Sequence, residues 1–206
     1  MSAVDRLLRS RLIGIVRLDD LELTVASAAC AIQAGLEVIE VTFTLPSAAR
    51  AIERLRHDHP AALIGAGTVR TVAELEDAAA AGAEFLVAPG LNSQLVEAAR
   101  IRGLPILPGV FTASEVDEAL RLGVEMLKLF PSEPLGPAYM SALLQPFPAA
   151  RLVPTGGITA ANAGAYLKAG AAAVAMGSSL FPGARIAADG PRVVAPLVAE
   201  ALAAVR

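Results

Sequence analysis

Long apolar runs are missing from this sequence of 206 residues, although 55% of them are hydrophobic and the mean hydropathy is +0.58. A membrane-spanning helix needs about 18 or more consecutive apolar residues. The nearest candidate, residues 169–184, is too short and is interrupted at Gly170, Gly177, Ser178, Ser179 and Pro182. The first ten residues alternate charged with apolar side chains and lack the apolar core of a secretory signal. We therefore expect a cytoplasmic protein that makes no membrane contact.

Positive charge and aromatic side chains are also scarce. The net charge is −3 at pH 7, no stretch is rich in lysine or arginine, and aromatic residues make up 4% of the chain. Nucleic-acid binding needs a basic surface that follows the phosphates, and single strands also need aromatic rings on which bases stack. We therefore do not expect nucleic acid as a partner.

Cysteine and histidine, two common metal ligands, are nearly absent. Cys30 is the only cysteine, and the apolar helix face predicted around it explains it as a core residue. His57 and His59 are the only histidines, and both fall in a polar segment at the end of a predicted helix. The sequence therefore lacks the histidine ligands of a metal-dependent aldolase and the catalytic histidine of a Ser-His-Asp hydrolase. We predict no bound metal and an exposed segment around the two histidines.

The sequence instead shows a regular alternation of short β-type runs with helical segments. The runs number eight, at residues 12–16, 38–43, 63–65, 85–87, 106–107, 126–130, 152–154 and 173–176. Each is followed by a turn and a stretch rich in alanine, leucine and glutamate, such as residues 71–81 and 114–122. Several of these stretches end on glycine, as at Gly35 and Gly170, where a left-handed residue is favoured. Successive βα units of this kind predict a parallel sheet.

The eight units favour an α/β fold of the (β/α)8 TIM-barrel type, formed by a single domain over residues 1–206. So many units in so short a chain, with no linker or low-complexity segment, fit a closed barrel with short loops. The rival is an open flavodoxin-like or Rossmann sheet, which needs a glycine-rich loop after its first strand. The segment there, residues 17–22, contains no glycine. In a barrel the chemistry lies at the C-terminal ends of the strands, so polar residues there are candidates.

Lys128 is the first candidate, because it stands in Met-Leu-Lys-Leu-Phe-Pro (126–131), a run that a parallel barrel buries on both faces. Strand alternation sends Leu127 and Leu129 outward to the helices and Lys128 into the barrel lumen. Burial there lowers the pKa of the amine, and a neutral amine attacks a carbonyl carbon. A structural ion pair with a carboxylate explains a buried lysine equally well, so this position alone leaves two readings open.

Glu40 repeats the anomaly in the second run, Val-Ile-Glu-Val-Thr-Phe (38–43), where it shares the lumen face with Val38 and Thr42. Partial burial raises the pKa of a carboxyl group, which can then both accept and donate a proton beside a Schiff-base lysine. The combination favours catalysis over a structural pair. Arg17 follows the first run and offers a guanidinium to a carboxylate or phosphate, although a solvated rim arginine fits its position nearly as well.

Glycine-rich segments follow the seventh and eighth runs, as Pro-Thr-Gly-Gly-Ile (154–158) and Met-Gly-Ser-Ser (176–179). In barrels these two loops commonly grip phosphate, because bare backbone N–H groups can approach its oxygens. The pair therefore indicates a phosphorylated ligand. Thr68 brings a hydroxyl to the end of the third run, and Pro89 shapes the exit of the fourth. For both residues, ordinary turn chemistry is an equal explanation.

Five segments together make the sequence resemble the 2-keto-3-deoxy-6-phosphogluconate (KDPG) aldolase family, with its phosphogalactonate and 4-hydroxy-2-oxoglutarate relatives. The resemblance spans nearly the whole chain. It is carried by Ile-Glu-Val-Thr-Phe-Thr-Leu-Pro (39–46), Ile-Gly-Ala-Gly-Thr-Val (64–69), Leu-Lys-Leu-Phe-Pro (127–131), Gly-Pro (136–137) and Val-Pro-Thr-Gly-Gly-Ile (153–158). It implies a metal-independent class I aldolase that needs no cofactor and assembles as a homotrimer.

The resemblance also implies roles for individual residues. Lys128 would be the Schiff-base lysine and Glu40 the general acid/base, with Thr68 at the carboxylate end of the substrate. Some family members have an arginine at the position of Thr44, where this chain has none, and Arg17 resembles the substitute found in another branch. The remaining expected substrate contacts are Pro89 and Phe130 and, around the phosphate, Thr155, Gly156, Gly157, Gly177 and Ser178.

The reaction that the resemblance implies is cleavage of KDPG, a small phosphorylated 2-keto acid, into pyruvate and glyceraldehyde 3-phosphate. The C4 epimer of the phosphogalactonate branch and 4-hydroxy-2-oxoglutarate are the alternative main substrates. Two other classes of barrel use the same glycine loops: a phosphosugar isomerase or synthase, and a metabolite-binding barrel without activity. The isomerase or synthase leaves the lysine inside Lys-Leu-Phe-Pro (128–131) unexplained. The metabolite-binding barrel would bind the keto acid phosphate without releasing pyruvate in a coupled assay.

Overall fold

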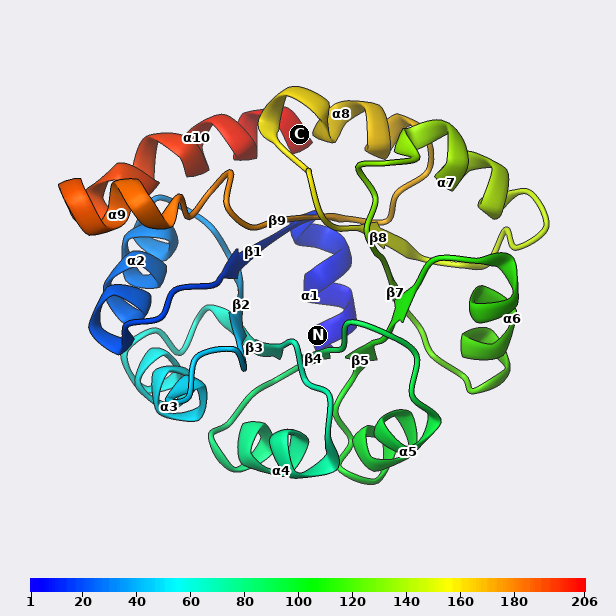
Figure 1. Ribbon diagram of the computed structural model, residues 1–206, viewed down its shortest axis with the longest axis horizontal. Coiled ribbons are helices and arrows are strands. Elements are labelled where there is room, and N and C mark those ends of the chain that lie inside the picture. The colour runs from blue at the N-terminus through cyan, green and yellow to red at the C-terminus, as the bar shows by residue number, and fades with distance from the viewer.

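The short apolar runs of the sequence form a ring of parallel strands in the computed structural model, which describes residues 1–206 (Figure 1). The strands are β1 (Leu12–Val16), β2 (Val38–Thr42), β3 (Leu63–Gly67), β4 (Leu86–Val87), β5 (Ile106–Leu107), β6 (Gly109–Val110), β7 (Leu127–Leu129), β8 (Leu152–Pro154) and β9 (Val174–Met176). All eight predicted runs form strands, with ends that shift by one or two residues, apart from the extension of the fifth described next.

Two stretches of sheet make up the ring, in the orders β5-β4-β3-β2-β1-β9 and β6-β7-β8. On one side they meet where Thr155, just after β8, pairs in parallel with Ala175 of β9. On the other side β5 and β6 are one barrel strand divided at Pro108, because proline has no N–H to donate to the ladder. The fifth predicted strand was therefore too short, since it continues past Pro108 to Val110. The result is a closed (β/α)8 barrel.

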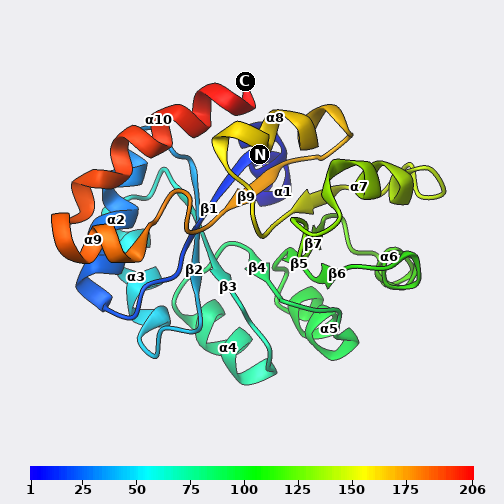
Figure 2. The same ribbon diagram turned by 45° about the horizontal axis from the view of Figure 1, so that its top comes forward.

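Helices surround the ring and cover its outer face, as Figures 1 and 2 show. They are α2 (Leu21–Gln33), α3 (Ala48–Asp58), α4 (Val72–Ala80), α5 (Ser93–Ile101), α6 (Ala113–Arg121), α7 (Gly136–Leu144), α8 (Ala160–Lys168), α9 (Gly183–Asp189) and α10 (Val194–Val205), with a 3-10 turn, η1 (Pro191–Val193). Capping boxes begin α4 and α6, the two helical segments predicted at residues 71–81 and 114–122. No helix has both the length and the apolar character that a bilayer crossing requires.

Apolar side chains pack in two layers, one on each face of the strands. The outer layer holds 49 buried residues between strands and helices, and the inner layer holds 13. α1 (Ala3–Ser10) closes the N-terminal end of the ring, where Val4 and Leu7 join the inner layer, and Figure 1 shows this helix across the centre of the ring. The sequence patterns did not predict α1. With this end plugged by apolar residues, the polar residues of the lumen gather towards the C-terminal ends of the strands.

Candidate active site

Lys128 is the central residue of β7, and its side chain lies on the inner face of the barrel. Leu127 and Leu129 belong to the outer layer, whereas Met126 belongs to the inner one, so alternation along the strand puts Lys128 inside. Lys128 is only 4% exposed. The orientation is the one that the alternation of β7 predicts.

Glu40 lies on the same inner face of β2 and is 1% exposed. Its carboxylate fills a space that Gly67 of the neighbouring strand β3 leaves free. A Cβ at position 67 would lie 2.5 Å from both Cγ and Cδ of Glu40. Gly65, two residues earlier on the same face, makes room in the same way for the ring of Phe85. The two glycines of Gly-Ala-Gly (65–67) therefore shape the lumen, and only the second contacts a titratable group.

Burial dominates the ionisation of the two charged groups. It raises the pKa of Glu40, and the positive charges of Lys128 and Arg17 act against that shift. It lowers the pKa of Lys128; the charge of Glu40 opposes this shift and the charge of Arg17 adds to it. Oε1 of Glu40 has no hydrogen-bond partner within the protein. The lumen therefore holds an amine that gives up its proton readily and a carboxyl group that takes one up readily.

The ends of β1 and β3 bring two of the predicted residues together. Nη2 of Arg17 donates a hydrogen bond to Oγ1 of Thr68 at 3.1 Å. Thr68 has a φ of 57°, in the left-handed region that β-branched residues rarely adopt. Thr44 lies at the neighbouring end of β2, where its hydroxyl is 2.8 Å from the hydroxyl of Thr42. The rim above Glu40 thus carries one guanidinium and a row of hydroxyl groups.

The predicted phosphate loops follow β8 and β9 and lie next to each other. Gly156 and Gly157 have φ values of 89° and 73°, which glycine adopts without strain. Gly177 and Ser178 come directly after β9. The two loops are joined by Oγ of Ser179, which donates to the backbone oxygen of Ile158 at 2.8 Å. The structure therefore brings together the five residues assigned to the phosphate end, Thr155, Gly156, Gly157, Gly177 and Ser178.

Phe130 connects the lysine with these loops. Nζ of Lys128 lies 5.0 Å from the centre of the Phe130 ring, and a Cβ at Gly156 would come within 3.2 Å of the same ring. At 39% exposure, Phe130 stands at the mouth of the barrel. Pro89 is also exposed, at the end of β4, and its backbone packs closely against Gly109 of β6. For Pro89 the structure thus provides a packing role at the strand exit.

Two buried residues beside the site, Ser132 and Tyr166, were missed by the sequence reasoning. Both are 2% exposed, and the hydroxyl of Tyr166 donates to the backbone oxygen of Ser132 at 3.0 Å. Ser132 offered one usable signal, since it is a polar residue that directly follows Lys-Leu-Phe-Pro (128–131). Tyr166 offered none, because in the sequence it is an aromatic residue of an ordinary helix.

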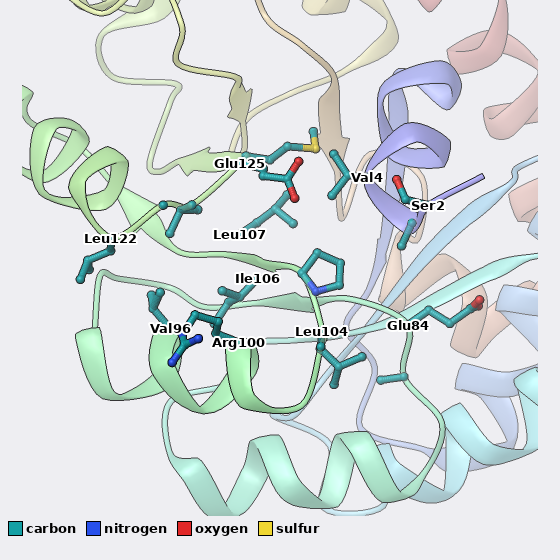
Figure 3. Close-up of a pocket in the computed structure, with 17 residues that line it drawn as sticks. Ser2, Val4, Glu84, Val96, Arg100, Leu104, Ile106, Leu107, Leu122 and Glu125 are labelled. Atoms are coloured by element: carbon teal, nitrogen blue, oxygen red, sulfur yellow. The ribbon is translucent and has the colours of Figure 1, made fainter.

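The opposite end of the barrel has different features. His57 lies in the last turn of α3 and His59 caps it, at the N-terminal side of β3 and away from Lys128. No group of three or more histidine, cysteine, aspartate or glutamate side chains is arranged to hold a metal ion. A cavity of about 660 Å³ opens at this end, between α1 and the segments that lead into β5 and β7 (Figure 3). It shares no residue with the predicted site.

In sequence and in fold, the chain is similar to known aldolases. A family model described as KDPG and KHG aldolase, where KHG is 4-hydroxy-2-oxoglutarate, matches residues 4–195. The 2-dehydro-3-deoxy-phosphogluconate aldolase of Treponema pallidum (strain Nichols) is 42% identical over 181 residues, which cover 87% of this chain and 86% of the relative.

Two solved structures add to this likeness. The KDPG aldolase of Legionella pneumophila, with pyruvate captured at low pH as a covalent carbinolamine, has a TM-score of 0.84 and 34% identity, covering 91% of this chain and 92% of that one. A cube-shaped protein cage designed by fusing symmetric oligomeric domains has a TM-score of 0.86 and 29% identity, covering 94% of this chain and 71% of that one. The chain belongs to the KDPG and KHG aldolase family.

Proposed function

We propose that this chain cleaves KDPG into pyruvate and glyceraldehyde 3-phosphate as a class I aldolase, with Lys128 as the residue that forms the Schiff base. One observation carries the proposal: Lys128 and Glu40 are the only charged residues among the buried ones, and both lie in the lumen below one rim. Burying two charged groups costs free energy, and the barrel would fold without them. A reaction that needs a neutral amine beside a proton carrier accounts for that cost.

The first half of the reaction uses the amine of Lys128. In its neutral form, which the lowered pKa favours, the amine adds to the C2 carbonyl of the keto acid and gives a carbinolamine. Loss of water then gives an iminium, which accepts the electron pair of the C3–C4 bond as that bond breaks. The carbinolamine is the type of adduct that the Legionella pneumophila relative holds with pyruvate.

The second half uses Glu40 as the proton carrier. Its carboxylate, directly or through a water molecule, takes the proton of the C4 hydroxyl, so that C4 leaves as the aldehyde of glyceraldehyde 3-phosphate. The pyruvate enamine that remains on Lys128 then takes up a proton at C3. Hydrolysis of the resulting imine releases pyruvate and restores the amine. The raised pKa of Glu40 suits a group that both accepts and returns a proton.

The rim residues bind the two ends of the substrate in this proposal. Arg17 and Thr68, already joined by a hydrogen bond, receive the carboxylate next to C2. The backbone N–H groups of the glycine loops after β8 and β9 receive the phosphate, with contacts from Gly156, Gly157, Gly177 and Ser178. Thr155, the fifth expected contact, is buried and donates its N–H and its hydroxyl to backbone and side-chain oxygens of the protein, so it shapes the start of the loop. Phe130 stands between the two ends, next to the reacting lysine.

The test is pyruvate release by the purified protein, measured with a lactate dehydrogenase coupled assay. KDPG, its C4 epimer and 4-hydroxy-2-oxoglutarate are compared at equal concentrations. We expect the highest kcat/KM with KDPG. If either other substrate gives a higher kcat/KM, that substrate is the main one and not KDPG. Equal values would mean that the enzyme does not discriminate among the three. No pyruvate release from any of them would refute the proposal.

The chain provides its own control for the lysine. It has two lysines, and the second, Lys168, lies exposed at the end of α8. We expect Lys128→Met to abolish pyruvate release and Lys168→Met to leave it unchanged. Activity that survives in Lys128→Met would refute the Schiff-base role.

We also propose that the chain forms one domain over residues 1–206 and assembles as a homotrimer. The likeness to a cage designed from symmetric oligomeric domains supports assembly. Light scattering coupled to size exclusion is expected to give three times the 21.0 kDa of the chain. A mass of one or two chains would contradict the trimer.

A further inference from the structure

Ser132 makes a network of hydrogen bonds directly behind the catalytic lysine proposed above. Its N–H donates to the backbone oxygen of Thr155 at 2.9 Å, and its Oγ donates to the backbone oxygen of Leu129 at 2.7 Å. The same Oγ accepts from the N–H of Thr155 at 3.1 Å, and that N–H also donates to Leu129 at 2.9 Å. The hydroxyl thus reinforces the last backbone bond between the ends of β7 and β8.

Tyr166 holds the same segment from outside the ring. Its hydroxyl reaches from α8 and donates to the backbone oxygen of Ser132 at 3.0 Å, and the N–H of Gly136 donates to that oxygen at 3.0 Å as well. Tyr166 is buried, and burial together with the charge of Glu133 raises the pKa of its phenol. The phenol therefore keeps its proton to a higher pH than an exposed tyrosine does, and it remains a hydrogen-bond donor there.

The position of Lys128 depends on this network because β7 is short. The strand has three residues, and its register sets Lys128 opposite Val153 and Leu129 opposite Pro154. Proline has no N–H, so the bond from Thr155 to Leu129 closes this end of the ladder. Leu129 is one residue from the lysine, and a lysine side chain is long and flexible. A small movement of its backbone therefore shifts Nζ away from a bound carbonyl.

We propose that Ser132 and Tyr166 are positioning residues that hold the Lys128 end of β7 against β8. The inference rests on the proposed Schiff-base function of Lys128. Both residues are buried, and their hydroxyls act through the backbone oxygens of Leu129 and Ser132. If the two residues only stabilise the turn, their substitution changes the unfolding free energy alone. If they position Lys128, their substitution also changes the reactivity of its amine.

Two readouts separate these roles. Loosening the end of β7 misplaces the amine, so kcat falls while KM changes little. It also lets water reach Lys128, which relieves the burial that lowers its pKa, so the pH midpoint of adduct formation rises. The charged groups that act on Lys128 are Glu40 from β2 and Arg17 from the end of β1, and neither is altered.

The experiment compares Ser132→Ala, Tyr166→Phe and the double variant with Ser10→Ala. Ser10 is a matched control, because its Oγ also donates to a strand carbonyl, that of Leu12 at 2.9 Å, but at the N-terminal end of the barrel. Pyruvate release and borohydride trapping of pyruvate are measured across pH, and thermal unfolding is followed separately. We expect each single variant to lose about tenfold in kcat, since a displacement of about 1 Å can cost about 100-fold.

The pH midpoint of trapping is expected to rise in both single variants, and the double variant is expected to lose less than the product of the two single losses, because both hydroxyls act on one segment. Variants that lose thermal stability but keep the kcat and pH midpoint of Ser10→Ala would overturn the inference. If Ser132→Ala does not fold, Tyr166→Phe decides the question alone. A wild-type protein that traps no pyruvate would instead overturn the proposed function.

Discussion

Gly67 offers a sharp test of how the lumen positions Glu40. In Gly67→Ala the new Cβ would lie 2.5 Å from Cγ and Cδ of Glu40, whereas ordinary van der Waals contact begins at 3.4 Å. Cγ and Cδ must therefore move by about 0.9 Å, the difference between these distances, and Oε1, which would lie closer still to the new Cβ, must move further. Overpacking of this kind costs about 1–3 kcal/mol of unfolding free energy. A displacement of about 1 Å of a reacting group costs about 100-fold in rate.

Gly65→Ala is the matched variant on the same strand and the same face. Its Cβ would lie 2.5 Å from Cδ1 and Cζ of Phe85, so it displaces an apolar ring and leaves Glu40 in place. We expect a similar loss of about 1–3 kcal/mol in unfolding free energy, with kcat reduced by no more than about threefold. Gly164→Ala, in α8 with its nearest neighbour 3.8 Å away, controls for a glycine replacement without overpacking.

The assay is pyruvate release under saturating KDPG, together with urea unfolding of each variant. We expect Gly67→Ala and Gly65→Ala to differ strongly in kcat while they lose similar unfolding free energy. Equal kcat values in the two variants would show that Glu40 tolerates displacement and that its exact position does not matter for the reaction. Because both variants lose a similar amount of unfolding free energy, that loss does not explain a difference in kcat between them.

Three further outcomes are expected. Arg17→Ala should raise KM for KDPG about tenfold or more in steady-state kinetics, because a charged hydrogen bond contributes about 1.5–3 kcal/mol, and an unchanged KM would remove Arg17 from the carboxylate end. Glu40→Gln combined with Lys128→Met should abolish activity and raise the unfolding free energy by about 1–4 kcal/mol in urea, because two buried charges that form no ion pair with each other are removed. Destabilisation would contradict this expectation. Leu7→Ala should cost about 2–5 kcal/mol of unfolding free energy and leave kcat unchanged, since Leu7 plugs the far end of the barrel.

The pH dependence of stability follows from the same pair of groups. The folded pKa of Lys128 is lowered, so between that value and 10.5 the unfolded chain binds more protons, and stability rises with pH. The folded pKa of Glu40 is raised, so its contribution is present below 4.5 and is lost as pH rises through the folded value. Urea unfolding across pH should show both slopes in the wild type, and the combined Glu40→Gln and Lys128→Met variant should lose both. If the same slopes persist in the variant, the pH dependence arises from other titratable groups.

Much of the barrel was predictable because its signals are local. Short β-type runs followed by helical segments mark each βα unit, and the count of eight favoured a closed ring. The two buried charges were also visible, since Lys128 and Glu40 interrupt apolar strands whose alternation points them inward. The KDPG and KHG aldolase family, predicted by resemblance, is confirmed by the match over residues 4–195.

The features that escaped prediction depend on contacts between distant parts of the chain. To predict that α1 plugs the barrel, one must know which end of the ring is open. To predict that the fifth strand extends past Pro108, one must know that it pairs with β7. The space that Gly67 leaves becomes apparent only when Glu40 of the neighbouring strand is placed against it. Tyr166 meets Ser132 across 34 positions of sequence, which no local pattern encodes.

The Schiff-base role of Lys128 is tested most directly by finding the amine to which pyruvate attaches. The protein is incubated with pyruvate and borohydride, digested, and mapped by mass spectrometry, with only Lys128, Lys168 and the N-terminal amine available for reaction. We expect a reduced pyruvate adduct on Lys128, formed at a lower pH than an exposed lysine would need, because burial lowers the pKa of that amine. An adduct confined to Lys168 or the N-terminus, or no adduct at all, would contradict this role.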